Sequence, residues 1–201
     1  MPAHASTGSL ASVSLKHSSL APQIKIGAVV LATSLTAAAA QFTMPLPFTA
    51  VPFVLTPMVV LLAGAALGSR LGALSQVLYL VAGAAGLPVF APSVTLPPGA
   101  LRLMGPTGGY LLAYPVAAFV TGWLAERGWD RRYLSSAAAM LLGLAIIFAG
   151  GVSWLAVAFS QTLTAAFASG LLPFIALDTV KVAAAAAILP AAWRITRSDQ
   201  V

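Results

Sequence analysis

An aspartate and a lysine stand three residues apart in a segment that is otherwise almost entirely apolar. Asp178 and Lys181 lie within Pro173-Phe-Ile-Ala-Leu-Asp-Thr-Val-Lys-Val-Ala-Ala-Ala-Ala-Ala-Ile-Leu-Pro190, in a chain with only 4 acidic residues. Residues at i and i+3 of a helix share one face, so the two side chains project together. Such a pair either binds a polar solute or forms an internal ion pair that fixes the helix. Ionisable residues at membrane depth favour the functional interpretation.

The composition decides that this helix lies in a membrane. Hydrophobic residues make up 60% of the 201 residues and charged residues only 7%, with a mean hydropathy of +0.97. Soluble domains contain about 25% charged residues, so this chain does not have enough charge to cover a globular surface. Several apolar stretches approach the roughly 20 residues that cross a bilayer as a helix. The sequence therefore predicts an all-α integral membrane protein.

The residue types that are missing exclude several kinds of chemistry. The chain has no cysteine, which rules out disulfides, thiolate metal sites and cysteine nucleophiles. Its two histidines, His4 and His17, both precede the first apolar segment. No Gly-rich loop carries the Lys and Ser or Thr of a nucleotide-binding P-loop. We therefore expect no enzyme, no cofactor and no metal site, and any ATP hydrolysis must come from other subunits.

The apolar segments predict six transmembrane helices with polar termini. The helices are expected at about 24–42, 53–67, 71–87, 107–126, 133–154 and 173–193. Residues 155–172 are expected to form a short helix at the interface or dipping into the bundle. The predicted organisation is a disordered cytoplasmic leader over 1–23, a six-helix membrane domain over 24–193 and a cytoplasmic tail over 194–201.

The basic residues predict the orientation. If the amino terminus is inside, the inner connections and tail hold most of the arginines, and the outer connections hold Arg102 alone. The inner group comprises Arg70, Arg127, Arg131, Arg132, Arg194 and Arg197. The positive-inside rule then places both termini of a multi-pass membrane protein in the cytoplasm. The charges follow topology and do not form a basic groove, so no nucleic-acid partner is expected.

Two patterns of small residues each allow two interpretations. In Gly105-Pro-Thr-Gly-Gly-Tyr110, the adjacent glycines admit either a ligand or a neighbouring helix, and the motif alone favours packing. In the first span, Ala28 and Ala32 begin a strip of small residues spaced by four. That strip suits internal packing and docking to another membrane subunit equally well.

Four runs together resemble the BioY family, the substrate-binding S components of energy-coupling-factor (ECF) biotin transporters. The resemblance covers almost everything from Ile24 to Pro190, with the motifs in the family's order. It departs at Pro52-Phe-Val-Leu-Thr-Pro57, where Thr56 replaces a glutamine that the family often has and Pro57 enters the second helix. The runs are Pro47-Phe-Thr-Ala-Val-Pro52, Leu61-Leu-Ala-Gly-Ala-Ala-Leu-Gly-Ser-Arg-Leu-Gly-Ala-Leu-Ser75, Leu78-Tyr-Leu-Val-Ala-Gly-Ala-Ala-Gly-Leu-Pro-Val-Phe-Ala91 and Gly105-Pro-Thr-Gly-Gly-Tyr-Leu-Leu112.

The resemblance implies a biotin pocket near the outer face of an ECF S-component fold. Asp178 and Lys181 match the family's Asp-x-x-Lys, which serves the biotin site, with the carboxylate suited to the ureido N–H groups and the ammonium to the ureido carbonyl. Arg102 is a candidate partner for the valerate carboxylate, and Tyr79, Phe90 and Tyr110 for apolar walls. The full predicted ligand-binding set is Asp178, Lys181, Gly105, Thr107, Gly108, Gly109, Tyr110, Arg102, Tyr79 and Phe90.

The resemblance also implies a location in the inner (plasma) membrane of a bacterial or archaeal cell, and it implies partners. Transport would be energised in trans by a membrane-embedded T component and ATPases, and Ala28 and Ala32 match the pattern by which S components dock on the T component. An S component for another vitamin and a carrier working without ATPases are the alternative functions. An intramembrane enzyme is disfavoured by the lack of His and Cys in the spans. The sequence leaves open whether the chain works alone, as a homo-oligomer or only with the energising subunits.

Overall fold

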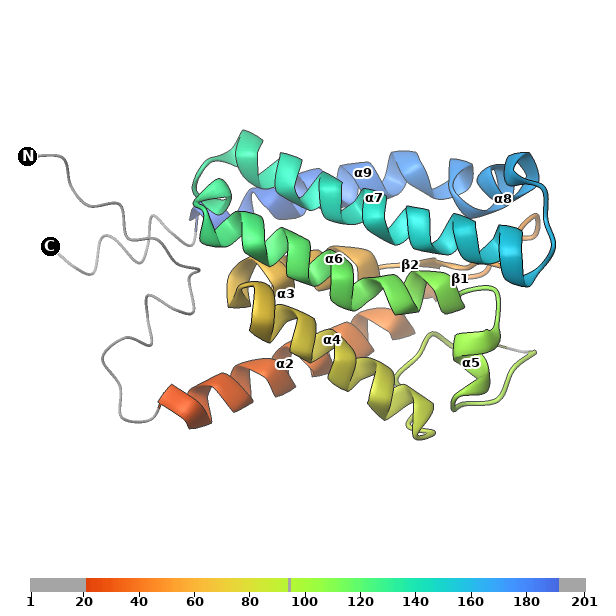
Figure 1. Ribbon diagram of the computed structural model, residues 1–201, viewed down its shortest axis with the longest axis horizontal. Coiled ribbons are helices and arrows are strands. Elements are labelled where there is room, and N and C mark those ends of the chain that lie inside the picture. The colour runs from red at the N-terminus through yellow and green to blue at the C-terminus, as the bar shows by residue number, and fades with distance from the viewer. Residues whose placement is uncertain (1–20, 94, 192–201) are drawn as a thin grey trace, which may run out of the picture.

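The computed structural model describes residues 21–93 and 95–191, and these residues are predominantly helical (Figure 1). A two-stranded antiparallel hairpin follows the first helix. The predicted leader and tail lie outside the described residues, apart from Ala21–Gln23, which already belong to helix α2. The elements are α2 (Ala21–Gln41), β1 (Thr43–Met44), β2 (Phe53–Val54), α3 (Thr56–Leu67), α4 (Ser69–Ala84), α5 (Leu101–Met104), α6 (Gly108–Glu126), the 3₁₀-helix η1 (Trp129–Arg131), α7 (Tyr133–Ala158), α8 (Leu163–Gly170) and α9 (Leu172–Ala186).

Among the described helices, 4 are long and apolar enough to cross a membrane: α2, α6, α7 and α9, the last continuing to Ala191. The second and third predicted spans correspond to the shorter helices α3, of 12 residues, and α4, of 16 residues. At about 1.5 Å per residue these are about 18 and 24 Å long, short of a hydrocarbon core of about 30 Å. The second helix was also predicted to begin too early, because Phe53 and Val54 form β2 and the helix begins at Thr56.

The predicted short helix between the last two spans is present, but its limits differ. Helix α7 runs to Ala158, four residues beyond the predicted end, and α8 covers only the second half of the segment 155–172. The side chain of Thr162 caps α8 by accepting a hydrogen bond from the Ala165 amide. Such a cap satisfies one of the free N–H groups at the helix start.

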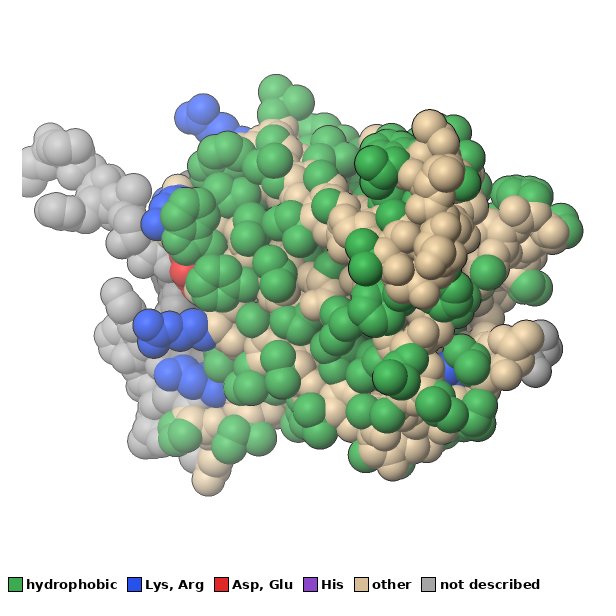
Figure 2. Space-filling model, turned by 45° about the vertical axis from the view of Figure 1, so that its right-hand side comes forward, with side chains coloured by type: hydrophobic (Ala, Val, Ile, Leu, Met, Phe, Trp, Pro, Cys, Tyr) green, Lys and Arg blue, Asp and Glu red, His purple; other side chains and the backbone are tan. Residues whose placement is uncertain are grey.

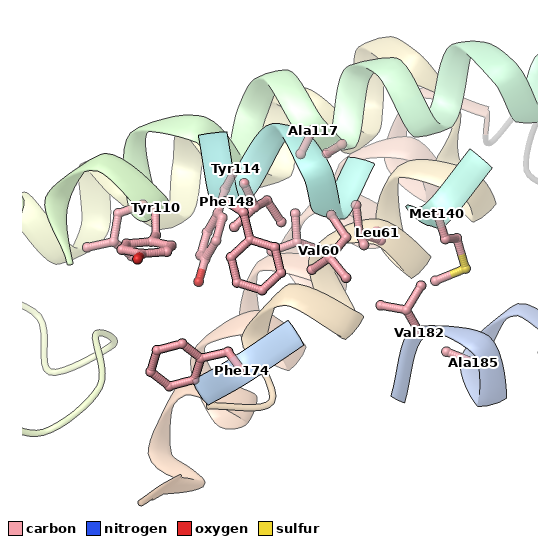
Figure 3. Close-up of a cluster of buried hydrophobic side chains, with 14 of the residues drawn as sticks. Val60, Leu61, Tyr110, Tyr114, Ala117, Met140, Phe148, Phe174, Val182 and Ala185 are labelled. Atoms are coloured by element: carbon pink, nitrogen blue, oxygen red, sulfur yellow. The ribbon is translucent and has the colours of Figure 1, made fainter. Parts of the chain in front are cut away.

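Helix α6 lies at the centre of the bundle and packs against α3, α4 and α7. Its close approach to α3 depends on glycine, because a Cβ on Gly64 would overlap the backbone of Ala118. Membrane helices commonly use small residues in this way to bring their backbones together. The buried core around this contact includes Val60, Leu61 and Met140 (Figure 3). The bundle is therefore closely packed at its centre.

The two ends of the bundle differ in charge (Figure 2). At one end, Arg70, Arg127 and Arg132 are exposed, and Lys and Arg side chains gather there in Figure 2. At this end Glu126 accepts hydrogen bonds from the Ser69 amide at 2.8 Å and hydroxyl at 3.0 Å, which caps α4. The hairpin and α5 lie at the other end (Figure 1). Hydrophobic side chains cover the flank between them (Figure 2), as a lipid-facing surface requires.

Candidate ligand site

A cavity of about 520 Å³ opens at the hairpin end of the bundle, away from the exposed arginines. Its walls come from the hairpin segment, the loop between α4 and α5, the first halves of α6 and α9, the middle of α7, and residues of α2, α3 and α4 next to them. This volume is in the range of small-molecule sites. Six residues of the predicted ligand set line it: Tyr79, Phe90, Arg102, Thr107, Tyr110 and Asp178.

Asp178 and Lys181 form the predicted ion pair, with 2.5 Å between Lys181 Nζ and Asp178 Oδ1. Asp178 is buried and lies on the cavity wall. Lys181 does not lie on this wall. Its ammonium group donates to the Val54 carbonyl at 2.7 Å and sits 3.8 Å from the centre of the Phe53 ring. The structure thus brings the pair together but presents only the carboxylate to the cavity.

Three glycines of the predicted ligand set, Gly105, Gly108 and Gly109, also lie off the cavity wall and are instead packing residues. A Cβ on Gly109 would overlap Trp154 and the backbone of Gly150, and one on Gly108 would overlap the backbone of Leu103. The indole of Trp154 donates to the carbonyl of Gly105 at 2.9 Å. These contacts hold α6 against α7 and so place Thr107 and Tyr110 on the cavity wall.

Tyr110 connects three helices at the cavity. Its hydroxyl donates to the carbonyl of Gly170 in α8 at 2.6 Å. Its ring lies where a Cβ on Gly151 of α7 would have to be. The hydroxyl of Tyr110 therefore already donates within the protein, and its ring forms an apolar part of the cavity wall.

Aromatic rings form much of the remaining wall. The ring of Tyr79 meets that of Phe90 edge to face, with 5.3 Å between centroids, and stacks with that of Tyr114 at 6.4 Å. Figure 3 shows Tyr110, Tyr114, Phe148 and Phe174 gathered at one side of the buried cluster. Sequence reasoning missed the last three. The spacing of four between Tyr110 and Tyr114 was a signal for Tyr114, because it puts both on one helix face.

Arg102 lies on the cavity wall and also fastens the loop that precedes it. Its guanidinium donates to the carbonyls of Pro97 at 3.1 Å and Ala91 at 2.8 Å. Burial lowers the pKa of this guanidinium, although arginine stays protonated in proteins. Within the described residues no carboxylate pairs with it. Arg102 therefore remains a candidate partner for an anionic group of a ligand.

No residue of the Pro-rich segment 44–52 belongs to the predicted ligand set. Its residues Pro45, Thr49, Val51 and Pro52 lie on the cavity wall. Thr49 also donates through its hydroxyl to the carbonyl of Ser169 at 2.8 Å, which ties the segment to α8. Prolines predict a non-helical connection, but they carry no information on which face of the bundle it covers.

The small-residue strip in α2 faces the interior. Ala32 is buried, with 6% of its surface exposed, and Ala28 is half-buried. Next to them, the hydroxyl of Thr33 donates to the carbonyl of Ser75 in α4 at 2.9 Å. The side chain of Ala32 is thus covered within the bundle, as internal packing requires, and its docking role stays a prediction.

A helix bundle with an apolar flank and a small-molecule cavity at one end defines a membrane protein that binds a solute. A carboxylate and a guanidinium on the same cavity wall suit a ligand with both hydrogen-bond donors and an anionic group.

The chain belongs to the BioY family, whose model matches residues 13–198. It is 41% identical over 166 residues to a probable biotin transporter BioY of Pyrococcus horikoshii, covering 82% of this chain and 93% of that protein. It is 40% identical over 147 residues to the biotin transporter BioY of Thermotoga maritima, covering 71% and 81%. Because these relatives are named as transporters, family membership confirms the resemblance and the expectation that the chain is not an enzyme.

The fold is also shared with a solved structure. The crystal structure of the S-component for biotin from an ECF-type ABC transporter superposes with a TM-score of 0.79 at 24% identity, covering 88% of this chain and 94% of that one. At this identity the likeness concerns the fold alone.

Proposed function

We propose that the protein is the high-affinity biotin-binding S component of an ECF-type vitamin uptake transporter. The observation that carries this proposal is the cavity itself, which places Asp178 and Arg102 on the walls of one mostly aromatic and aliphatic space. Biotin has a polar ring at one end, an apolar middle and a carboxylate at the other end, and the cavity offers a partner for each.

The two charged wall residues have different tasks in this proposal. Asp178 accepts hydrogen bonds from the ureido N–H groups, which are donors that a carboxylate binds well. Lys181 compensates the charge of Asp178, because an unpaired carboxylate in an apolar environment is very costly. Arg102 binds the valerate carboxylate, and Tyr79, Phe90 and Tyr110 contact the thiophane ring and the chain. Thr107 adds a hydroxyl to the wall.

We propose six membrane spans with both termini in the cytoplasm. In this arrangement α3 and α4 are two short spans that follow one another through a tight turn at Gly68, whose φ of +86° suits glycine. The end with Arg70, Arg127 and Arg132 faces the cytoplasm under the positive-inside rule. The cavity end, which carries Arg102, then faces the outside, where a vitamin is captured.

Transport then requires partners in trans, a T component and ATPases. The closely packed contact between Gly64 and Ala118 lies between the cavity and the arginine end and favours a closed floor below the ligand. The covered position of Ala32 favours an exposed part of α2 or another helix as the docking surface. An S component for another small vitamin would share the cavity but would not bind biotin in the test below, whereas a carrier that works without ATPases would take up biotin with no T component or ATPases present.

The decisive experiment is equilibrium binding of labelled biotin to the detergent-purified protein, with riboflavin, thiamin and desthiobiotin as competitors. We expect tight binding that only desthiobiotin displaces. Asp178→Asn removes a charged acceptor and is expected to weaken binding about ten- to hundredfold. A folded protein that binds thiamin or riboflavin instead of biotin would replace this function with that of another vitamin-binding S component.

A further inference from the structure

A second pocket lies beside the ligand cavity, between the end of α2 and the loop that joins α4 to α5. Its volume is about 430 Å³, which is in the range of small-molecule sites. The two spaces share a wall, and Arg102 is part of it, whereas Asp178 lines the ligand cavity alone. The shared residues are Phe90, Pro92, Ser93, Thr95, Leu96 and Arg102.

This arrangement places the second pocket beyond one end of the ligand. In the proposed function the ureido ring is held at Asp178 and the carboxylate at Arg102, so biotin ends where the second pocket begins. We propose that the second pocket continues the ligand site and admits biotin amides whose added chain ends in a carboxylate, such as biotinylated amino acids. The proposal rests on the proposed function, because it takes the position of biotin from it.

The guanidinium of Arg102 has donors for both spaces. It carries five N–H groups. Its bonds to the carbonyls of Pro97 and Ala91 use one N–H on Nε and one on Nη1. The other N–H groups can bind the amide oxygen of an extended ligand, or a carboxylate through two parallel hydrogen bonds.

The charge of the second pocket selects the end of the added chain. Arg102 is positive, and none of the described residues on the pocket wall is acidic. Ser93 and Thr95 add hydroxyl groups to this wall, while Leu87 and Leu96 offer apolar surface to the methylene groups of a chain. A chain that ends in a carboxylate is therefore favoured over one that ends in an ammonium group.

Side-chain contacts tie the walls of the second pocket to two helices. On one side, the amide of Gln41 at the end of α2 donates to the carbonyls of Pro88 at 3.3 Å and Phe90 at 3.4 Å. On the other side, Arg102 of α5 donates to the carbonyl of Ala91 at 2.8 Å. The loop that forms the shared wall is thus fastened from both helices.

The first test compares ligands. Biotin amides of methylamine, aminohexanoic acid and diaminopentane compete against labelled biotin for the detergent-purified protein. The methylamide ends at Arg102, and the other two continue with chains that end in a carboxylate or an ammonium group. We expect the aminohexanoic amide to bind about ten- to hundredfold more tightly than the diaminopentane amide, the range for a hydrogen bond to a charged group.

The second test locates the added chain. The chain of the protein has no cysteine, so Leu87→Cys puts a single thiol on the wall of the second pocket. Met104→Cys is the matched control, because it lines neither space. Both side chains are exposed, at 55% and 70%. At about ten times its Kd, the aminohexanoic amide should slow maleimide labelling at position 87 about tenfold. Biotin should not slow it, and labelling at position 104 should not change.

A variant that fills the second pocket tests the same point by affinity. Leu87→Trp adds a large ring there and leaves the ligand cavity intact, since Leu87 is not on its wall. We expect the aminohexanoic amide to bind about five- to 150-fold more weakly, as overpacking costs predict, with biotin affinity unchanged. Val81→Trp is the control, because Val81 is exposed on α4 and lines neither space.

The outcomes separate this inference from the proposed function. If the protein binds biotin but excludes the extended amides, the proposed function stands and the inference is wrong. The inference is also wrong if the aminohexanoic amide binds without protecting the thiol at position 87, because its chain then runs into solvent. If the protein binds neither biotin nor any amide, the proposed function is overturned and the inference with it.

Discussion

The substitution Gly83→Ala tests whether Phe90 is a wall of the ligand space. The added methyl group acts on the Phe90 ring and does not itself reach the ligand. Gly83 lies near the end of α4, and a Cβ there would overlap the outer edge of the Phe90 ring. That ring is buried, lines the cavity and packs edge to face on Tyr79. Carbon atoms pack best at about 3.5–4.0 Å, so the added methyl must move the ring by roughly 1 Å or more.

The size of the effect follows from the cost of overpacking. Adding a methyl to a well-packed site costs about 1–3 kcal/mol. If the ring moves into the cavity, that strain is felt when the ligand binds, and the affinity for biotin falls about five- to 150-fold. If the loop holding Phe90 moves outward instead, the cost appears as lower thermal stability. Arg102 fastens this loop at Ala91, which favours movement of the ring.

The assay is equilibrium binding of biotin with a thermal midpoint measured on the same sample. Gly27→Ala is the matched control, because a Cβ on Gly27 meets nothing within 4 Å. We expect that variant to bind like the parent. Combining Gly83→Ala with Phe90→Leu should recover part of the lost affinity, because a smaller side chain leaves room for the methyl. A Gly83→Ala protein with the parent's midpoint and the parent's affinity would refute the assignment of Phe90 to the ligand space.

Three further predictions concern the charged and polar contacts. Arg102→Met should weaken binding of biotin about ten- to hundredfold but leave binding of its methyl ester nearly unchanged, as competition assays would show; equal losses for both would exclude the carboxylate contact. Glu126→Gln should lower the thermal midpoint by removing a charged cap worth about 1 kcal/mol from the Ser69 end of α4, with biotin affinity unchanged; an unchanged midpoint would contradict the cap. Tyr110→Phe should destabilise the protein by about 1 kcal/mol by leaving the Gly170 carbonyl without its donor, and a stability equal to the parent's would show that water replaces the hydroxyl.

The sequence predicted the long helices well because each is a simple apolar run. The starts of α6 and α7 at Gly108 and Tyr133 lie within one residue of the prediction. The predicted starts of the second and third helices were less accurate, since hydropathy does not distinguish a strand such as Phe53–Val54 from the first turn of a helix. Hydropathy also does not predict the lengths of two short helices that are joined by a turn at a glycine, as α3 and α4 are at Gly68.

The candidate site was predictable where a residue type is rare in its surroundings. A carboxylate in an apolar helix identified Asp178, because a charge at membrane depth is costly without a partner. Arg102 was a candidate because an anionic ligand group needs a cation nearby and Arg102 is the basic residue of the predicted outer connections. Glycines gave no such signal. Gly109 was included in the predicted ligand set, yet it faces Trp154 and serves the contact with α7. A small residue permits close approach equally to a ligand and to a helix, so only the three-dimensional packing distinguishes the two.

The geometry of one helical turn explains why Asp178 lies on the cavity wall and Lys181 does not. Residues three apart differ by about 60° around the helix and by about 4.5 Å along it. That offset lets Asp178 face the cavity while Lys181 reaches Val54 of the hairpin, with the two side chains still in contact. A pair spaced by seven would face the same way but lie about 10 Å apart, too far for a short carboxylate to reach the ammonium group. The spacing of three therefore allows one ion pair to place its carboxylate on the cavity wall and its ammonium group against the hairpin.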